Sequence, residues 1–310
     1  MPLLKNAGPT SASFLVSLKS FILACRPKTL SAAVVPVIVG VAVTHFLGFK
    51  VDFPVALYVL LSALLIQVGT NLFNDALDFE KGADTHVRLG PRRATHMGWF
   101  SPRQIKIAAL CCFILASLVA LPLVLRGGWP IVAIGLVSLL LGYLYTGGPR
   151  PLAYSGLGDF FVIAFFGVVA VMGTVYLQTH EWLTAAFVAG IQVGALATVL
   201  IAINNFRDMD TDRVVGKMTL PARFGAWFAR CEIAVMFALA FGLLVYWTTR
   251  PSVFLLLFLP PFILAMTVVS RACRIRPSEH MNRLLHLAAL TQMTFGLAFT
   301  GLLVWGGKAL

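Results

Sequence analysis

The stretch PVALYVLLSALLIQVGTNLFNDALDFEKGAD, residues 54–84, passes from a long apolar run into a cluster of acidic side chains. Residues 54–73 supply the roughly 20 apolar residues that a membrane-spanning helix needs. The acids that follow them are Asp75, Asp78, Glu80 and Asp84. Carboxylates are costly beside lipid, and in membrane proteins they mark functional sites. The stretch therefore predicts a spanning helix that ends in a functional site.

The whole chain has the composition of a membrane protein. Hydrophobic residues make up 59% of it and charged residues 12%, and its mean hydropathy is +0.89, whereas about a quarter of a soluble domain is charged. Nine apolar segments are long enough to span a bilayer. They run over approximately 30–48, 54–73, 104–124, 129–146, 159–177, 183–203, 225–248, 253–270 and 283–305. We therefore expect an all-α membrane protein, a nine-transmembrane-helix bundle that forms a single domain over residues 1–310, with an interfacial helix over residues 1–29.

The basic residues are distributed unevenly between the two sides of such a bundle. With a cytoplasmic N-terminus and nine spans, 20 of the 24 Lys and Arg residues fall on the cytoplasmic side. This asymmetry follows the positive-inside rule. The net charge of +12 therefore does not indicate nucleic acid as a partner, and nothing in the sequence indicates an obligate protein partner.

A second acidic motif, NNFRDMDTDRVVGK, occupies residues 204–217. The two motifs together hold 7 of the 12 acidic residues of the chain, and each follows an even-numbered predicted span. They share an Asn-xxx-Asp spacing, followed by another Asp on the same helical face. The matching residues are Asn71, Asp75 and Asp78 in the first motif and Asn204, Asp208 and Asp212 in the second. This repetition predicts two related halves.

Clustered carboxylates repel one another, so the two motifs need a cation. Oxygen ligands without His or Cys are typical of Mg²⁺, which commonly completes its coordination on substrate phosphates. We therefore predict Mg²⁺ as the cofactor, with Asp75, Asp78, Asp208 and Asp212 as catalytic metal ligands. The alternative is that these are solvated acids at the membrane surface. The neighbouring basic residues are candidate phosphate ligands: Arg88, Arg92, Arg93, Arg150, Lys217 and Arg223.

Six sequence blocks together resemble one family. They are RPKTL (26–30), NLFNDALDFEKGAD (71–84), RLGPRRATHMG (88–98), YTGGPRPLAYSGLGD (145–159), NNFRDMDTDRVVGKMTLPARFG (204–225) and NRLLHLAALTQMTFG (282–296). In this order they are similar to the UbiA superfamily of intramembrane aromatic prenyltransferases. The GPRR, TGGP and GKMTL blocks favour the branch that prenylates 1,4-dihydroxy-2-naphthoate, an enzyme of menaquinone synthesis in the bacterial cytoplasmic (inner) membrane.

The resemblance implies a bundle with a central, lipid-open cavity and a site at the cytoplasmic end, where Mg²⁺ binds a polyprenyl diphosphate. It implies that the polyprenyl group passes to the naphthoate with loss of CO₂, giving demethylmenaquinol. The substrate-binding residues that it implies, those of the two motifs included, are Asn71, Asn74, Asp84, Tyr145, Arg150, Asn204 and Lys217. Arg26 and Lys28 are candidates for the acceptor carboxylate.

Two other functions remain open from the sequence. One is prenylation of another aromatic acceptor, 4-hydroxybenzoate or homogentisate, which would keep a benzoate carboxylate instead of releasing CO₂. The other is a secondary transporter, because related halves with polar sites also occur in that class. Both acidic motifs lie at helix ends rather than in mid-span, which favours the enzyme.

Overall fold

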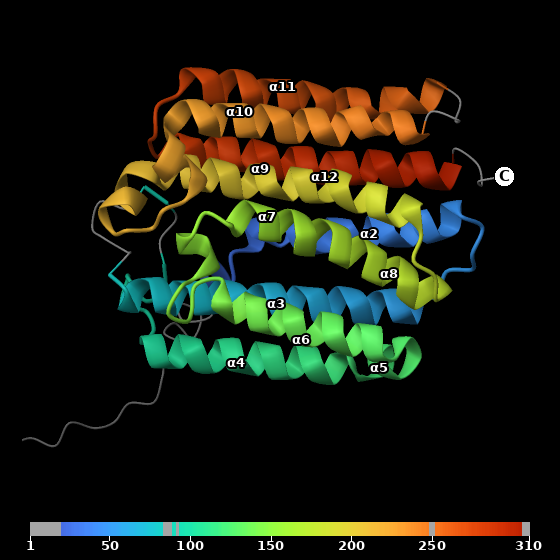
Figure 1. The fold of residues 1–310 in the computed structure, drawn as a ribbon, viewed down its shortest axis with the longest axis horizontal. Helices are drawn as coiled ribbons and strands as arrows, with labels where there is room; N and C mark the ends of the chain where they lie inside the picture. Colours follow the sequence, from blue (N-terminus) through green and yellow to red (C-terminus); the bar gives the residue numbers. More distant parts are fainter. Residues whose placement is uncertain (1–19, 83–88, 91–92, 248–251, 306–310) are drawn as a thin grey trace, which may run out of the picture.

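The computed structural model describes residues 20–82, 89–90, 93–247 and 252–305, and these residues form a bundle of helices without strands (Figure 1). The α-helices are α2 (Ser31–Phe46), α3 (Phe53–Glu80), α4 (Pro102–Val119), α5 (Leu121–Gly127), α6 (Trp129–Leu144), α7 (Gly158–Ile163), α8 (Ala170–Thr179), α9 (Thr184–Val214), α10 (Leu220–Gly242), α11 (Leu259–Arg274) and α12 (Met281–Trp305). Short helices are η1 (Pro27–Thr29), η2 (Leu152–Tyr154), the π-helix η3 (Ala164–Val169), η4 (Leu243–Trp247) and η5 (Ser252–Phe258). The predicted all-α class is confirmed.

Seven helical segments of the described chain are long and apolar enough to cross a membrane. They are Phe53–Glu80, Pro102–Val119, Gly158–Thr179, Thr184–Val214, Leu220–Trp247, Leu255–Arg274 and Met281–Trp305. The other two predicted spans correspond to α2 and α6, which have 16 residues each and are shorter than this. The protein is therefore an integral, multi-pass membrane protein.

The predicted span 104–124 is not one continuous helix. Helix α4 begins at Pro102, and the side chains of Ser101 and Gln104 form a capping box at its N-terminus. Helix α4 ends at Val119, and Pro122 lies in the first turn of α5. Proline has no backbone N–H and clashes with the preceding turn, so it interrupts a helix but is tolerated at the start of one. This proline divides the predicted span in two.

Helix α9 is the centre of the bundle. Its apolar window is 78% buried, far more than that of any other candidate span in the described chain. Figure 1 shows α10 and α12 along one side of it and α7 on the other. The contact with η3 is made backbone to backbone, because a Cβ atom added to Gly167 would lie 2.3 Å from the carbonyl oxygen of Gly190. Small residues allow such close approach of helices in membranes.

The chain reaches the same end of the bundle after α3, α6, α9 and α11 (Figure 1). Most of the predicted interfacial helix 1–29 lies outside the described residues. Its described end, residues 20–24, is helical, and Ala24 belongs to an apolar cluster with Leu72 and Phe73 of α3, against which Phe21 packs. The N-terminal segment therefore adjoins the first acidic motif.

Candidate active site

The two acidic motifs meet around Tyr154, which lies in the loop after α6. The Tyr154 hydroxyl donates to Oδ1 of Asp78 at 3.0 Å, and the backbone N–H of Met218 donates to the Tyr154 carbonyl at 3.1 Å. Lys217 Nζ lies 3.3 Å from Oδ1 of Asp212 and 6.0 Å from the centre of the Tyr154 ring. The loops that hold Tyr154 and Lys217 therefore bring Asp78 of α3 and Asp212 of α9 to one site.

The side chains of Asn74 and Asp78 on α3 face this site. Arg26 donates to Oδ1 of Asn74 at 2.7 Å, and Nδ2 of Asn74 donates to the Thr146 hydroxyl at 2.8 Å. Arg93 forms a buried ion pair with Oδ2 of Asp78 at 2.8 Å. The predicted substrate-binding residue Asn74 is thus next to the predicted metal ligand Asp78, with Arg26 beside them.

Asn71 and Asp75 face different partners from those of Asn74 and Asp78. Nδ2 of Asn71 donates to the carbonyl of Cys25 at 3.1 Å and to the hydroxyl of Thr29 at 3.2 Å. The Asp75 carboxylate is 1% exposed and accepts from the backbone N–H groups of Ala94 and Thr95, at 2.9 and 3.1 Å, and from the Thr95 hydroxyl.

This placement does not favour the predicted role of Asp75 as a metal ligand, because three donors already occupy its carboxylate. The structural reason is that the Asn-xxx-Asp spacing occurs twice in the first motif. Asn71 and Asp75 form one pair, and Asn74 and Asp78 form the other. The second pair is the one directed at the site.

In the second motif, Asp212 pairs with Lys217 and lies near enough to Asp78 for their charges to interact. Its side chain is buried, and its Oδ2 atom has no hydrogen-bond partner among the described residues. Asp208 pairs with Arg207 at 2.6 Å, and Arg207 donates to Asn282 at 2.7 Å. Asn204 lies half-buried one turn before Asp208 on α9.

The donor set fits a cation that is shared with a bound diphosphate. Among the described residues, no group of three His, Cys, Asp or Glu side chains is placed to hold a metal ion, and Asp84 lies outside them. Mg²⁺ in proteins is often held by one or two carboxylates and completed by substrate phosphates. Asp78 and Asp212 match that pattern, and the unpartnered Oδ2 atom of Asp212 is an available ligand.

The basic residues predicted to bind the substrates do not all lie at the site. Lys217 lies in the site, whereas Arg150 is exposed. Arg223 donates to the carbonyls of Met218 and Ser155, which makes it a support for the loops. Arg88, Arg92 and the Lys28 side chain lie outside what the structure describes.

Sequence reasoning missed Tyr154 and Lys81. Burial and the neighbouring Asp78 carboxylate both raise the pKa of Tyr154, so its hydroxyl stays protonated and donates. Lys81 Nζ lies 5.0 Å from the centre of the Tyr154 ring and donates to the Thr146 carbonyl. Burial lowers the pKa of Lys81, and Asp78 acts against that shift. The sequence feature that could have identified Tyr154 as a site residue is its position within the block YTGGPRPLAYSGLGD.

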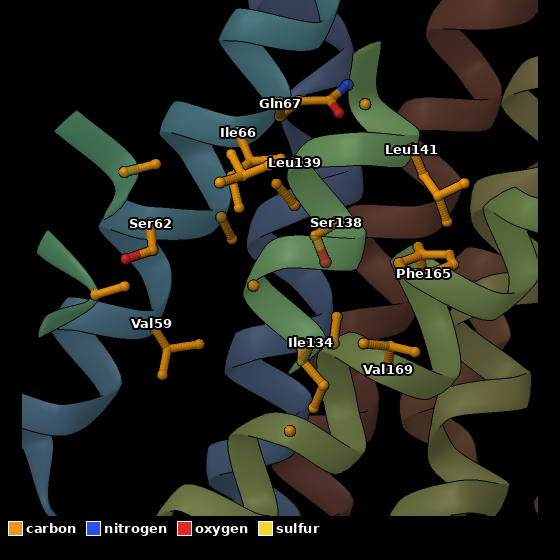
Figure 2. Close-up of a pocket in the computed structure, with 18 of the residues that line it drawn as sticks. Val59, Ser62, Ile66, Gln67, Ile134, Ser138, Leu139, Leu141, Phe165 and Val169 are labelled. Atoms are coloured by element: carbon orange, nitrogen blue, oxygen red, sulfur yellow. The ribbon is translucent and has the colours of Figure 1, made fainter. Parts of the chain in front are cut away.

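An apolar cavity of about 460 Å³ lies next to the site, between α2, α3, α6 and the α7–η3–α8 segment (Figure 2). Tyr145 and Thr70 line it near the acidic motifs, and Val59 lines it farther along α3. Leu121 and Leu136 also line it and are exposed on the outside of the bundle. The cavity therefore reaches the surface that would face lipid.

A family model described as the UbiA prenyltransferase family matches residues 33–303. A 1,4-dihydroxy-2-naphthoate octaprenyltransferase of Escherichia coli (strain K12) is 39% identical over 211 residues, which cover 66% of this chain and 68% of that protein. A protein of the same name from Mycobacterium tuberculosis is 30% identical over 292 residues, 94% of this chain and 99% of that protein.

Solved structures share the fold at low sequence identity. An apo structure of a UbiA homologue from Aeropyrum pernix K1 has a TM-score of 0.67 at 16% identity, covering 87% of this chain and 96% of that one. A UbiA homologue from Archaeoglobus fulgidus bound to GPP and Mg²⁺ has a TM-score of 0.55 at 15% identity, covering 91% of this chain and 99% of that one.

Proposed function

Because the chain belongs to the UbiA prenyltransferase family, we propose that it transfers a polyprenyl group from polyprenyl diphosphate to 1,4-dihydroxy-2-naphthoate with loss of CO₂. The product is demethylmenaquinol, an intermediate of menaquinone synthesis. The observation that carries the acceptor is the name shared by relatives that align with up to 94% of this chain. Membership of an enzyme family also argues against the transporter alternative.

The acidic motifs are proposed to hold the diphosphate. Asp78 and Asp212 would hold Mg²⁺, with Asn74 and Asp208 beside them, and the ion would neutralise charge on the diphosphate when bound. Its presence in a UbiA homologue with GPP supports this assignment. Lys217 and Tyr154, which contact Asp212 and Asp78, would stabilise the negative charge that develops as the diphosphate leaves with the bonding electron pair.

The cavity is proposed to hold the prenyl chain and to keep water from the allylic cation. Its wall is almost entirely apolar, and Tyr145, Phe161 and Phe165 present aromatic faces that can stabilise a cation. The ring carbon that bears the carboxylate forms the new bond to the prenyl group. The bond to CO₂ then breaks, and its electron pair restores the aromatic ring.

The reaction is tested by incubating membranes that contain the protein with a polyprenyl diphosphate and carboxyl-labelled dihydroxynaphthoate. We expect one equivalent of labelled CO₂ for each prenylated product, because decarboxylation accompanies ring attack. Unlabelled 4-hydroxybenzoate is the matched alternative acceptor. Prenylation of 4-hydroxybenzoate without any reaction of the naphthoate would overturn the acceptor assignment but not the family.

We also propose that all nine predicted spans cross a bacterial cytoplasmic (inner) membrane, with the site and the N-terminus on the cytoplasmic side. Helix α6 packs beside the long helix α3, and α2 packs beside α12 and α8, so both shorter helices run within the bundle. The uneven distribution of basic residues supplies the orientation.

Labelling of single cysteines tests the orientation in sealed cells. Arg150 and Lys50 are both exposed and belong to opposite ends of the bundle. Arg150→Cys should resist a membrane-impermeant maleimide, and Lys50→Cys should react, in a background where the five native cysteines are replaced. The reverse pattern would show that the protein has the opposite orientation.

A further inference from the structure

A buried amide without a partner interrupts the apolar wall of the cavity. Gln67 on α3 is 8% exposed and lines the cavity, and its Oε1 atom has no hydrogen-bond partner among the described residues. Figure 2 shows its side chain extending from α3 toward α6. Leaving a buried amide unpaired costs on the order of 1–3 kcal/mol. The Gln67 oxygen is therefore a group whose burial is unfavourable unless a ligand pairs with it.

Other buried glutamines of the described chain have partners for this oxygen. Gln178 accepts from the N–H of Asp52 at 2.8 Å and donates to the Asp52 carbonyl at 3.0 Å. Gln192 accepts from the Trp247 indole at 2.8 Å, and Gln292 accepts from the Ser31 hydroxyl at 3.1 Å. The side-chain oxygens of these three residues therefore have structural partners, although Nε2 of Gln292 has none, whereas Oε1 of Gln67 has no partner among the described residues.

The position of Gln67 relative to the acidic site indicates what it would contact. It precedes Asn74 by seven residues, which is about two helical turns and roughly 10 Å along the same face of α3. Thr70 lies between them and also lines the cavity. A Cβ atom added to Gly142 of α6 would lie 2.6 Å from the Thr70 hydroxyl oxygen. Thr70 therefore packs directly against Gly142, and both residues line this part of the cavity.

We propose that Gln67 is a specificity-determining residue whose amide hydrogen-bonds a ring hydroxyl of the aromatic acceptor. This inference rests on the proposed function. A prenyl chain is a hydrocarbon and cannot pair with the amide, whereas the acceptor is an aromatic diol. With the diphosphate at Asp78 and Asp212, as proposed above, the allylic carbon would lie at the end of the cavity that Thr70 and Tyr145 line, and the attacking ring would have to lie next to that carbon.

Of the two ring hydroxyls of the acceptor, the one at position 4 is available for this contact. The hydroxyl at position 1 of 1,4-dihydroxy-2-naphthoate adjoins the carboxylate and can bond to it within the molecule. The hydroxyl at position 4 has no such partner. The compound 1-hydroxy-2-naphthoate lacks only this second hydroxyl, so it reports directly on the proposed contact.

Gln67→Met tests the inference, because Met has a similar volume and cannot form this hydrogen bond. Binding of both naphthoates to the full-length protein is measured by their fluorescence, with Mg²⁺ and inorganic pyrophosphate present. Wild type should bind the diol about tenfold more tightly than 1-hydroxy-2-naphthoate, and Gln67→Met should bind the two about equally. Thermal stability should not fall, since the substitution removes an unpaired buried amide.

Gln178→Met is the matched control. It replaces a buried glutamine that has partners, so it should lose thermal stability and retain the tenfold discrimination. Equal discrimination by wild type and Gln67→Met would overturn the inference, as would a wild type that binds both naphthoates equally. A wild type that binds the diol but forms no prenylated product in the labelled-acceptor assay would instead overturn the proposed function.

Discussion

Asp212→Asn is expected to slow prenyl transfer by about 100-fold or more, the scale of losing one charge-stabilising group in an active site. The carboxylate is buried next to Lys217, and its Oδ2 atom has no partner among the described residues. An amide of the same shape keeps the packing but removes the negative charge that a metal ion needs. The protein should therefore stay folded while the Mg²⁺ concentration needed for half-maximal turnover rises.

Asp210→Asn is the control on the same helix. The Asp210 side chain is 69% exposed and lies 3.9 Å from Arg213, so its removal should leave turnover close to that of wild type. Turnover of all three proteins is measured across a Mg²⁺ titration with saturating polyprenyl diphosphate. Near-normal activity of Asp212→Asn, or full activity in excess chelator, would contradict the proposed site.

Asp75→Asn is expected to destabilise the protein by roughly 3 kcal/mol, because two backbone N–H groups and a hydroxyl lose a buried charged acceptor. The substitution should also lower activity indirectly. The segment that Asp75 holds, Ala94 and Thr95, directly follows Arg93, whose guanidinium pairs with Asp78. Thermal unfolding in detergent measures the loss of stability.

Glu80→Gln provides the comparison for Asp75→Asn. The Glu80 side chain is 40% exposed and pairs with Lys106, so its loss should change stability by no more than about 0.5 kcal/mol. The experiment also separates two roles for Asp75. If Asp75→Asn unfolds like wild type but requires more Mg²⁺, Asp75 is a metal ligand, as the sequence predicted, and not an anchor for the loop.

The sequence predicts that the two acidic motifs lie at one end of the bundle, but it does not predict which Asn–Asp pair of the first motif faces the second. Acids that directly follow an apolar span are candidates for a functional site in a membrane protein. On α3, however, Asn71, Asp75 and Asp78 share one broad face, and Asn74 lies at its edge. Which edge faces the second motif depends on how residues 93–95 pack against the helix. That packing is tertiary and has no local signature.

Tyr154 illustrates the same limit. A single tyrosine in a loop has no periodicity or partner in the sequence that would indicate its role. Its position depends on the loop folding back to the residue after Lys217, where the Met218 N–H donates to its carbonyl. The proline that divides α4 from α5 was visible in the sequence, and its effect on the predicted span 104–124 follows from its chemistry.

The close contact between η3 and α9 makes the two sides of the cavity mechanically unequal. Where Gly167 meets Gly190, backbone touches backbone, and no side chain can change rotamer to provide room. On the opposite side, only Ile131 of the sixteen residues of α6 is buried. A segment with few buried contacts can be displaced locally at a low cost in free energy. The cavity therefore has one stiff wall, where η3 is held against α9, and one compliant wall, which borders lipid.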